Sequence, residues 1–509
     1  MANKYVMKRN NANNIVVFKR DARNIGRRAL EECLAVTGII AGTVSVKNIN
    51  RSEDLGFDFF ELSDIPFSEY YTPDGATSAG TSQTQVIDVL NKVFSDSIQF
   101  HEIVGEYGAY VDSSADPQAA TGTIQYPYTT IQDDVDNADD GDRVRVNGDF
   151  ELTTAVILDP NKSVELIGTN NACIGYSTYS ASNDKAFYQS VSSSTKSYKF
   201  ENIKIHGSGD YGIYIRSASE VIVEDCEFTN NGWSGSGLNT VLDSGTSGVL
   251  GFDSSDIDLQ AFYAGPEASN GGAMRIRSTT KVEITSCEVY NNLRGLRIQD
   301  CGVNGSGFIT RNNVYQNIES GIYLASGSYD QASGCENFTV NNNGSYYNAN
   351  NGVLVIGGIN NVIALNQVKG NWNAGVMAWH CSNTRLRDMD LSDNNRSQYN
   401  GIGNTGDAAS SIQISGGTIR AGADYIVDVL DTQVYNTGLG ANTSRVGLQV
   451  SSNVSDINDR HTSLINIDDV GFKNQDYAVD ILCDLDKVRL TLGDCRYIDT
   501  TEKNVKLTN

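Results

Sequence analysis

The chain has 509 residues and a formal net charge of −24, because 62 acidic side chains outnumber 38 basic ones. Its hydrophobic content of 39% is too high for a disordered chain. The acidic balance excludes general nucleic-acid binding, and no run of 18 or more apolar residues predicts insertion into a membrane. At this length we expect either several domains or one long repeat array.

The N-terminal region differs from the rest of the chain in charge. The first 28 residues hold eight Lys or Arg and one acid, Asp21, and they lack the unbroken apolar segment of a secretory signal peptide. Apolar spacing predicts amphipathic helices at residues 21–37 and 83–95. We expect residues 1–111 to form a small mixed α/β head, and the Ser/Ala/Gly-rich residues 112–124 to form a neck. A basic head on an acidic chain would be drawn to an acidic partner surface.

After the neck, the chain predicts a short helix followed by a strand. The residues at helical spacing are Ile131, Val135 and Ala138. Thr129 or Thr130 is expected to cap the N-terminus of this helix, and Gly141 is expected to close it. Val144 and Val146 then alternate with charged residues, as in a half-buried strand. Together these elements predict the start of a repeat array.

Short apolar runs then recur along the chain. The equivalent positions are Ile276, Ile298, Leu324, Val355 and Ala378. They are separated by 22, 26, 31 and 23 residues, and each run precedes a second apolar alternation. Such units cannot bury their apolar faces alone and must stack, which predicts a parallel β-helix over residues 125–409. The step of 61 residues from Ile215 to Ile276 predicts an insertion at 232–271. The weaker alternation of residues 410–509 predicts a distinct β-rich C-terminal part.

One column of the array predicts stacked polar side chains. Its members are Cys226, Cys287, Asn312, Asn343, Asn366 and Met389. Because stacked strands lie ~4.8 Å apart, three successive Asn residues could form an amide ladder, although they could also be plain loop residues. The nine Cys residues have irregular spacing and no CxxC pair, so we expect small buried side chains rather than disulfides.

The start of the array carries a family resemblance. The segment Pro127-Tyr-Thr-Thr-Ile-Gln leads into Gly141-Asp-Arg-Val-Arg-Val. This pattern resembles the N-terminal cap and first coil of pectin-lyase-like right-handed β-helix proteins. The resemblance covers residues 120–405 and implies an all-β protein, a right-handed parallel β-helix with the small head and β-rich end described above.

The organisation of the chain resembles that of bacteriophage tail spikes or tail fibres, which combine a small head with an elongated β-helix. The resemblance implies a virion structural protein that binds host surface polysaccharide, attaches to tail or baseplate proteins through its N-terminal region, and forms a homotrimer. A polysaccharide depolymerase, either a lyase or a glycoside hydrolase, is an alternative on the same scaffold. A bacterial surface adhesin is a third possibility, which the missing signal peptide disfavours.

Catalytic motifs are weak in this sequence. The polygalacturonase signatures Asn-Thr-Asp and Gly-His-Gly do not occur, nor does the Asp-Pro-His-Glu of alginate epimerases. The candidate acids are Asp300, Glu319, Asp388, Asp390 and Asp393. In an acidic protein each is better explained as a solvated turn residue. We therefore favour a binding protein over an enzyme, leave its catalytic residues unassigned, and expect no metal and no cofactor.

Ligand-binding residues are expected on the insertion and on the outward face of the first strand of each coil. These residues are Trp233, Tyr263, Tyr214, Arg275, Arg297 and Asp300. Sugars stack on aromatic rings and accept hydrogen bonds from Arg, although the loop aromatics could instead fold onto the side of the helix.

Farther along the same outward face, the side chains become apolar. They are Leu354, Ile356, Met377 and Trp379. A patch of this size is rarely left bare in a soluble monomer. We expect it to be the contact between subunits of a trimer, unless a C-terminal segment folds back to cover it.

Overall fold

The computed structural model describes residues 5–9, 15–19, 46–49, 57–61, 109–115, 127–178, 180, 183–232, 271–301, 305–326, 334–371, 373–379, 381–392, 410–416, 425–435, 446–452, 463–473, 477–482, 488–498 and 503–507. The chain forms two compact units. The first contains Met1–Tyr110, Ala115–Tyr128 and Asp142–Val144, and the second contains Val111–Ser114, Thr129–Gly141 and Arg145–Asn509.

The described part of the first unit includes a four-stranded antiparallel sheet. Its strands, in sheet order, are β1 (Tyr5–Arg9), β2 (Ile15–Lys19), β4 (Phe57–Glu61) and β3 (Val46–Ile49). The helices predicted at residues 21–37 and 83–95 lie outside the described residues. Within the part of the chain that the structure describes, no helix is long and apolar enough to cross a membrane.

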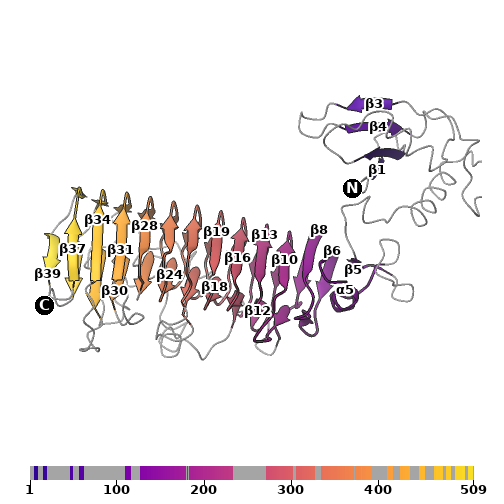
Figure 1. The fold of residues 1–509 in the computed structure, drawn as a ribbon, viewed down its shortest axis with the longest axis horizontal. Coiled ribbons are helices and arrows are strands. Elements are labelled where there is room, and N and C mark those ends of the chain that lie inside the picture. The colour runs from indigo at the N-terminus through magenta and orange to yellow at the C-terminus, as the bar shows by residue number, and fades with distance from the viewer. Residues whose placement is uncertain are drawn as a thin grey trace, which may run out of the picture. The chain divides into compact units, whose positions relative to one another are not determined.

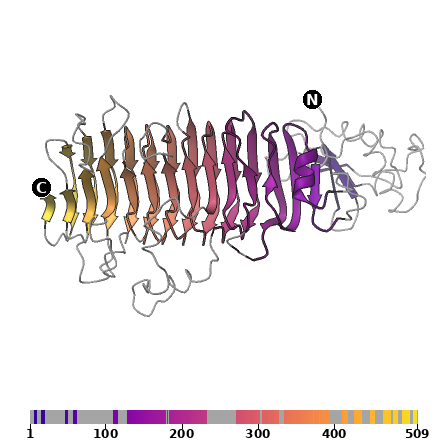
Figure 2. The same cartoon turned by 90° about the horizontal axis from the view of Figure 1, so that it is seen from below.

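The second unit is a parallel β-helix whose coils follow one another along the body (Figures 1 and 2). A regular coil contributes one strand to each of three rows. The first row comprises β7 (Val156–Ile157), β9 (Phe187–Gln189), β12 (Tyr211–Arg216), β15 (Gly272–Arg277), β18 (Leu296–Gln299), β21 (Ile322–Ala325), β24 (Val353–Ile356), β27 (Val376–Trp379), β30 (Ser410–Gly416), β33 (Val446–Ser452), β36 (Tyr477–Leu482) and β39 (Lys503–Leu507).

The second and third rows complete each coil. After β5 (Ala109–Asp112), the second row comprises β6 (Asp142–Glu151), β8 (Val164–Gly175), β10 (Ser197–Glu201), β13 (Glu220–Glu224), β16 (Lys281–Thr285), β19 (Ser306–Thr310), β22 (Phe338–Asn341), β25 (Val362–Ala364), β28 (Thr384–Arg387), β31 (Tyr425–Leu430), β34 (Ser463–Asp468) and β37 (Val488–Leu492). The third row comprises β11 (Lys204–His206), β14 (Glu227–Thr229), β17 (Glu288–Tyr290), β20 (Asn313–Tyr315), β23 (Gly344–Tyr346), β26 (Gln367–Lys369), β29 (Asp390–Ser392), β32 (Gln433–Tyr435), β35 (Gly471–Lys473) and β38 (Arg496–Ile498). The long strand β8 pairs with both β10 and β11.

The apolar repeat sets the register of the coils. The aligned inward positions are opposite one another in successive parallel strands, as predicted: Ile215, Ile276, Ile298, Leu324, Val355 and Ala378. All six are fully buried. Burial contributes roughly 1.5–3 kcal/mol for each large aliphatic side chain, so a slip by one residue would expose a whole column.

The turn between the second and third rows requires a left-handed backbone in every coil from β10 to β35. The residues at this position have φ between 48° and 58°: Asn202, Asp225, Ser286, Arg311, Asn342, Leu365, Asp388, Asp431 and Asp469. Asn and Asp tolerate this region better than other residues that carry a Cβ. The frequent Asn and Asp at this position therefore reflect a requirement of the coil geometry.

The predicted amide ladder is confirmed. Asn312 donates from Nδ2 to Oδ1 of Asn343 at 3.0 Å, and Asn343 donates in the same way to Asn366 at 3.0 Å. A longer ladder, which we did not predict, follows the third row: Asn231, Asn292, Asn317, Asn348 and Asn371. These buried amides also bond to backbone groups of neighbouring coils, which satisfies the polar groups of the turns.

The cysteine prediction is confirmed for five residues. Cys226, Cys287, Cys301, Cys335 and Cys381 are buried thiols, and none of the cysteines in the described ranges forms a disulfide. Burial raises the pKa of the Cys381 thiol to about 12.

The first coils begin at the short helix α5 (Ile131–Asn137), whose N-cap is Thr130, as predicted. The helix ends at Asn137, before Gly141, because the backbone is already extended at Ala138.

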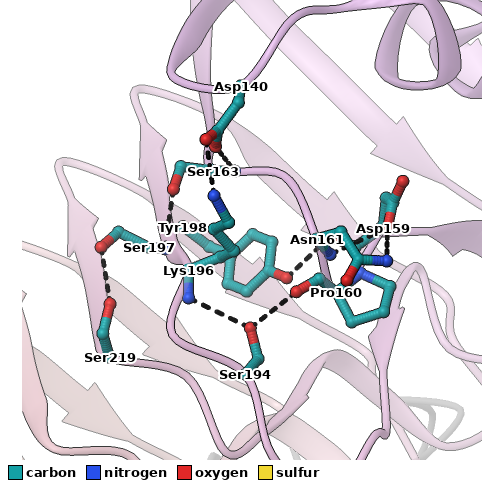
Figure 3. Close-up of polar contacts among 10 residues, drawn as sticks. All are labelled: Asp140, Asp159, Pro160, Asn161, Ser163, Ser194, Lys196, Ser197, Tyr198 and Ser219. Carbon is teal, nitrogen blue, oxygen red and sulfur yellow. Dashed lines mark hydrogen bonds and ion pairs between the residues drawn. The ribbon is translucent and has the colours of Figure 1, made fainter.

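The turns that follow α5 are joined by polar contacts (Figure 3). Asp140 accepts hydrogen bonds from Lys196 Nζ at 2.5 Å and from the backbone N–H of Ser163 at 2.8 Å. The hydroxyl of the buried Tyr198 donates to the backbone oxygen of Asp159 at 2.9 Å. These contacts connect turns of successive coils at the N-terminal end of the β-helix.

The boundary predicted at residue 409 does not separate two folds. The first-row strand β30 pairs in parallel with both β27 and β33, and the pairing continues through β36 to β39. The described strands after residue 409 are therefore further coils of the same β-helix. Sequence spacing becomes irregular there because longer segments separate the strands, while the inward columns persist, as at Ile414 and Val450.

Candidate functional site

Five residues form one outward column on the first row. Cross-strand register places them in the order Tyr188, Tyr214, Arg275, Arg297 and Tyr323. All five side chains are half-buried, whereas the inward residues beside them in the strands are buried. We call this set the arginine–tyrosine column. With strands ~4.8 Å apart, it extends over about 19 Å along the body.

Beyond this column, most outward side chains in the same register of the first row are buried. The next residues in register are Leu354, Met377, Gln413, Gln449 and Asp480. All except Met377 are buried, and Met377 is half-buried. Ile157, which precedes Tyr188 in register, is 48% exposed, so the side chains of this register that are not buried are Ile157, the arginine–tyrosine column and Met377 among the described residues.

The four side chains of the predicted subunit interface differ in exposure. Leu354 and Ile356 occupy outward positions, but they are only 8% and 4% exposed in a single chain, and Met377 and Trp379 are half-buried. Two of the four side chains are therefore buried within the single chain and two are half-buried, and their role in a subunit contact stays a prediction.

Cations lie against the aromatic rings of the column. The guanidinium of Arg275 is 5.6 Å from the ring centroid of Tyr214, and that of Arg297 is 5.5 Å from the ring of Tyr323. Lys185 Nζ lies 4.9 Å from the ring of Tyr188. These distances fall within the range of favourable cation–π contacts and fix the rings in place.

The two central arginines are hydrogen-bonded to neutral groups. Arg275 donates from Nε and Nη2 to Oε1 of Gln299, at 3.0 and 2.7 Å. Arg297 donates from Nη1 to the hydroxyl oxygen of Tyr211 at 3.2 Å, and the same oxygen accepts from Arg294 Nη1 at 3.2 Å. Tyr211 is fully buried, so it anchors the arginines and is not itself a surface for a ligand.

Three other cations around the column have a carboxylate partner, whereas Arg216, which lies opposite Arg277 in register, has none among the described residues. Arg277 Nε lies 3.0 Å from Asp300, Arg294 Nη2 donates to Glu319 at 2.8 Å, and Lys185 Nζ lies 2.7 Å from Asp210. Among the residues that the structure describes, no carboxylate bonds to Arg275 or Arg297. The Nε–H of Arg297 is also buried without an acceptor.

The electrostatics follow from these partners. Burial, and then the charge of Arg297, lower the pKa of Arg275. The two arginines are register partners on adjacent strands, so each positive charge disfavours the other. By contrast, burial opposes the charge of Lys185, but its hydrogen bond to Asp210 raises its pKa overall.

The structure brings together three of the predicted ligand-binding residues: Tyr214, Arg275 and Arg297. Asp300 follows β18 in a left-handed turn and pairs with Arg277, so it lies outside the column. Trp233 and Tyr263 lie outside the described residues. Of the candidate acids, Glu319 is paired with Arg294, Asp388 and Asp390 are exposed, and Asp393 is also outside the described residues.

Sequence reasoning missed four residues of this region: Tyr188, Tyr211, Arg294 and Tyr323. Tyr323 occupies the aligned position of Tyr214 within Gly321-Ile-Tyr-Leu, so the alternation already contained its signal. Tyr211 and Arg294 come just before the aligned apolar runs that start at Gly212 and Gly295. Only the folded chain shows that their side chains form a hydrogen bond. Within the described ranges, no group of three or more His, Cys, Asp or Glu side chains could hold a metal ion.

Comparison with known proteins places the fold. Residues 143–344 match the family described as "Right handed beta helix region". A search of curated protein sequences finds no match.

Similar solved structures share little sequence with the chain. The A-module of the Azotobacter vinelandii mannuronan C-5 epimerase is 12% identical, with a TM-score of 0.37 and coverage of 79% of this chain and 97% of that one. A surface adhesin of Streptococcus pneumoniae is 11% identical, with a TM-score of 0.37 and coverage of 78% and 93%. The Dettilon tailspike protein is 11% identical, with a TM-score of 0.30 and coverage of 70% and 62%. The coil register and the family match together show that the chain has the predicted right-handed parallel β-helix fold.

Proposed function

We propose that the chain is a glycan-binding β-helix protein that acts in host attachment as a tail spike or tail fibre of a bacteriophage virion. The observation that supports binding is the arginine–tyrosine column, five half-buried side chains that follow one another in register along the first row. Aromatic rings offer apolar faces to sugar rings, and the arginines between them offer hydrogen-bond donors to sugar oxygens. The rigid coils hold these groups in a fixed line, which lowers the entropy cost of binding.

The test is binding of the purified protein to an array of bacterial surface polysaccharides. The double variant Tyr214→Ala/Tyr323→Ala removes two rings of the column and is expected to weaken binding by roughly tenfold or more. The control is Tyr290→Ala/Tyr315→Ala on the third row, where two rings stack on each other with centroids 5.1 Å apart. Because their faces are turned toward each other, the control should bind like wild type. Absence of binding to every polysaccharide, or equal loss in both variants, would contradict the proposed function.

Depolymerisation on the same scaffold is the second candidate. The pair Arg275 and Arg297 favours it, because two guanidinium groups could stabilise the negative charge that develops on a uronate when its proton is removed. Incubation with each bound polysaccharide tests this activity. New reducing ends, or absorbance in the unsaturated-uronate band, would establish an enzyme, and their absence with intact binding would contradict the depolymerase candidate.

The remaining parts of the proposal concern assembly. We expect residues 1–111 to attach the protein to tail or baseplate proteins, and the β-helix to assemble as a homotrimer. A chain lacking residues 1–111 should keep its glycan binding but should not be incorporated into particles. Incorporation of the truncated chain would contradict the anchoring role, and sedimentation of the full chain as a monomer would contradict the trimer.

A further inference from the structure

We propose that Arg275 and Arg297 together bind an oxyanion of an acidic sugar, either a uronate carboxylate or a sulfate ester. This inference rests on the proposed glycan-binding function and specifies the class of glycan. It concerns noncovalent recognition, so it holds whether or not the glycan is subsequently cleaved.

The first argument is geometric. Arg275 and Arg297 are direct partners in the register of the parallel strands β15 and β18, on the outward face of both. Their Cα atoms are therefore separated by the ~4.8 Å spacing of adjacent strands. Gln299 and Tyr211 each hold one guanidinium by its hydrogen bonds, so the pair is preorganised. A single carboxylate or sulfate has enough acceptor oxygens to bond to both arginines at once.

The second argument is charge. The chain carries a net charge of −24, and the neighbouring cations Lys185, Arg277 and Arg294 all have an acidic partner. Only neutral groups bond to Arg275 and Arg297 among the described residues, so two like charges without a carboxylate partner lie on adjacent strands of a half-buried surface. An anion placed between them replaces this repulsion with two charge-assisted hydrogen bonds. A neutral sugar would leave the repulsion in place.

The third argument is the order of the column. Tyr214 precedes the two arginines in register, and Tyr323 follows them, each with its ring against the adjacent guanidinium. A sugar chain along the column would therefore place its rings at the tyrosines and an acidic substituent at the centre. Shielding of Leu354 in the next strand ends the accessible track on one side.

The test uses the polysaccharide array in matched sets: each native glycan, its carboxyl-reduced form and its desulfated form. We expect every glycan bound through the column to lose roughly tenfold or more in affinity when its oxyanion is removed. The two chemical treatments distinguish a carboxylate from a sulfate. The variant Arg275→Gln/Arg297→Gln should weaken binding of the native glycan similarly, and it should no longer discriminate between native and neutralised forms.

The matched control is Arg385→Gln/Arg387→Gln on β28 of the second row, which changes the net charge equally at two exposed arginines. It should bind like wild type. Equal affinity for native and neutralised glycans would overturn the acidic-sugar inference, and so would full binding by Arg275→Gln/Arg297→Gln. If either of these results were obtained while Tyr214→Ala/Tyr323→Ala still lost binding, the proposed glycan-binding function would stand without the acidic-sugar inference. Absence of wild-type binding to every glycan would overturn both the proposed function and the acidic-sugar inference.

Discussion

Removing one amide from the longer asparagine ladder should destabilise the middle of the β-helix. Asn317 is fully buried, and its Oδ1 accepts from the backbone N–H of Asn292 at 3.1 Å. Its Nδ2 donates to the backbone oxygens of Val289 at 3.2 Å and Tyr315 at 3.1 Å, and to Oδ1 of Asn348 at 3.0 Å. The substitution Asn317→Ala therefore breaks contacts with the coils on both sides.

The size of the effect follows from the groups left behind. The buried N–H of Asn292 loses its side-chain acceptor, which costs about 1–3 kcal/mol, and each lost bond to a carbonyl costs about 0.5–1.5 kcal/mol. We expect the free energy of unfolding to fall by about 3 kcal/mol. In Asn317→Asp, a carboxylate would face carbonyl oxygens, which raises the pKa of the new acid in the folded state. That variant should therefore be less destabilised at pH 4 than at pH 7.

Urea unfolding followed by circular dichroism measures the total effect, and hydrogen exchange of the flanking coils locates it, since each coil contacts mainly its neighbours. The control is Asn373→Ala, where a half-buried amide donates to Asn350 at 3.3 Å. That change should cost less than about 0.5 kcal/mol. If Asn317→Ala were as mild as the control, or if protection were lost only far from its coil, the reasoning about the ladder would be refuted.

Three further predictions concern the coil geometry. Leu365 is 51% exposed and has a left-handed backbone with φ 56°, which is strained for a leucine. Leu365→Asn should therefore raise the free energy of unfolding by about 1 kcal/mol and shift the urea midpoint upward. An unchanged midpoint would contradict backbone strain at this residue. Gly295→Ala should lower the free energy of unfolding by about 1–3 kcal/mol in urea, because the added Cβ would clash with the carbonyl oxygen of Gly321 in the next coil; a neutral effect would contradict this close packing. Burial raises the pKa of Tyr198 to about 12, so its stabilising contribution is complete below about pH 10 and is lost as the pH rises toward 12. Thermal unfolding between pH 9 and 12 should therefore be less pH-dependent in Tyr198→Phe, and an identical profile would refute this assignment.

The column that starts at Ile215 could be predicted because an apolar side chain must stack on another in the next coil. Only a few alignments of the sequence satisfy that requirement, and the structure has the predicted one. The same reasoning found Asn312 and its two successors, since they keep a fixed distance from the apolar anchors. It did not find the ladder through Asn317, because those residues lie in turns whose path is not given by strand alternation.

Sequence by itself determined the coil, its register and the outward direction of Tyr214, Arg275 and Arg297, because local alternation and stacking fix all three. Only the tertiary structure decided which cations are neutralised. Arg275 and Arg277 are two positions apart on the same face of one strand, yet only Arg277 meets an acid, because Asp300 follows the next strand of the row. Tertiary structure likewise decided that Leu354 is shielded while Tyr323, its neighbour in register, remains accessible. Pairing of charges and covering of a face depend on contacts between segments distant in sequence, and no local periodicity encodes them.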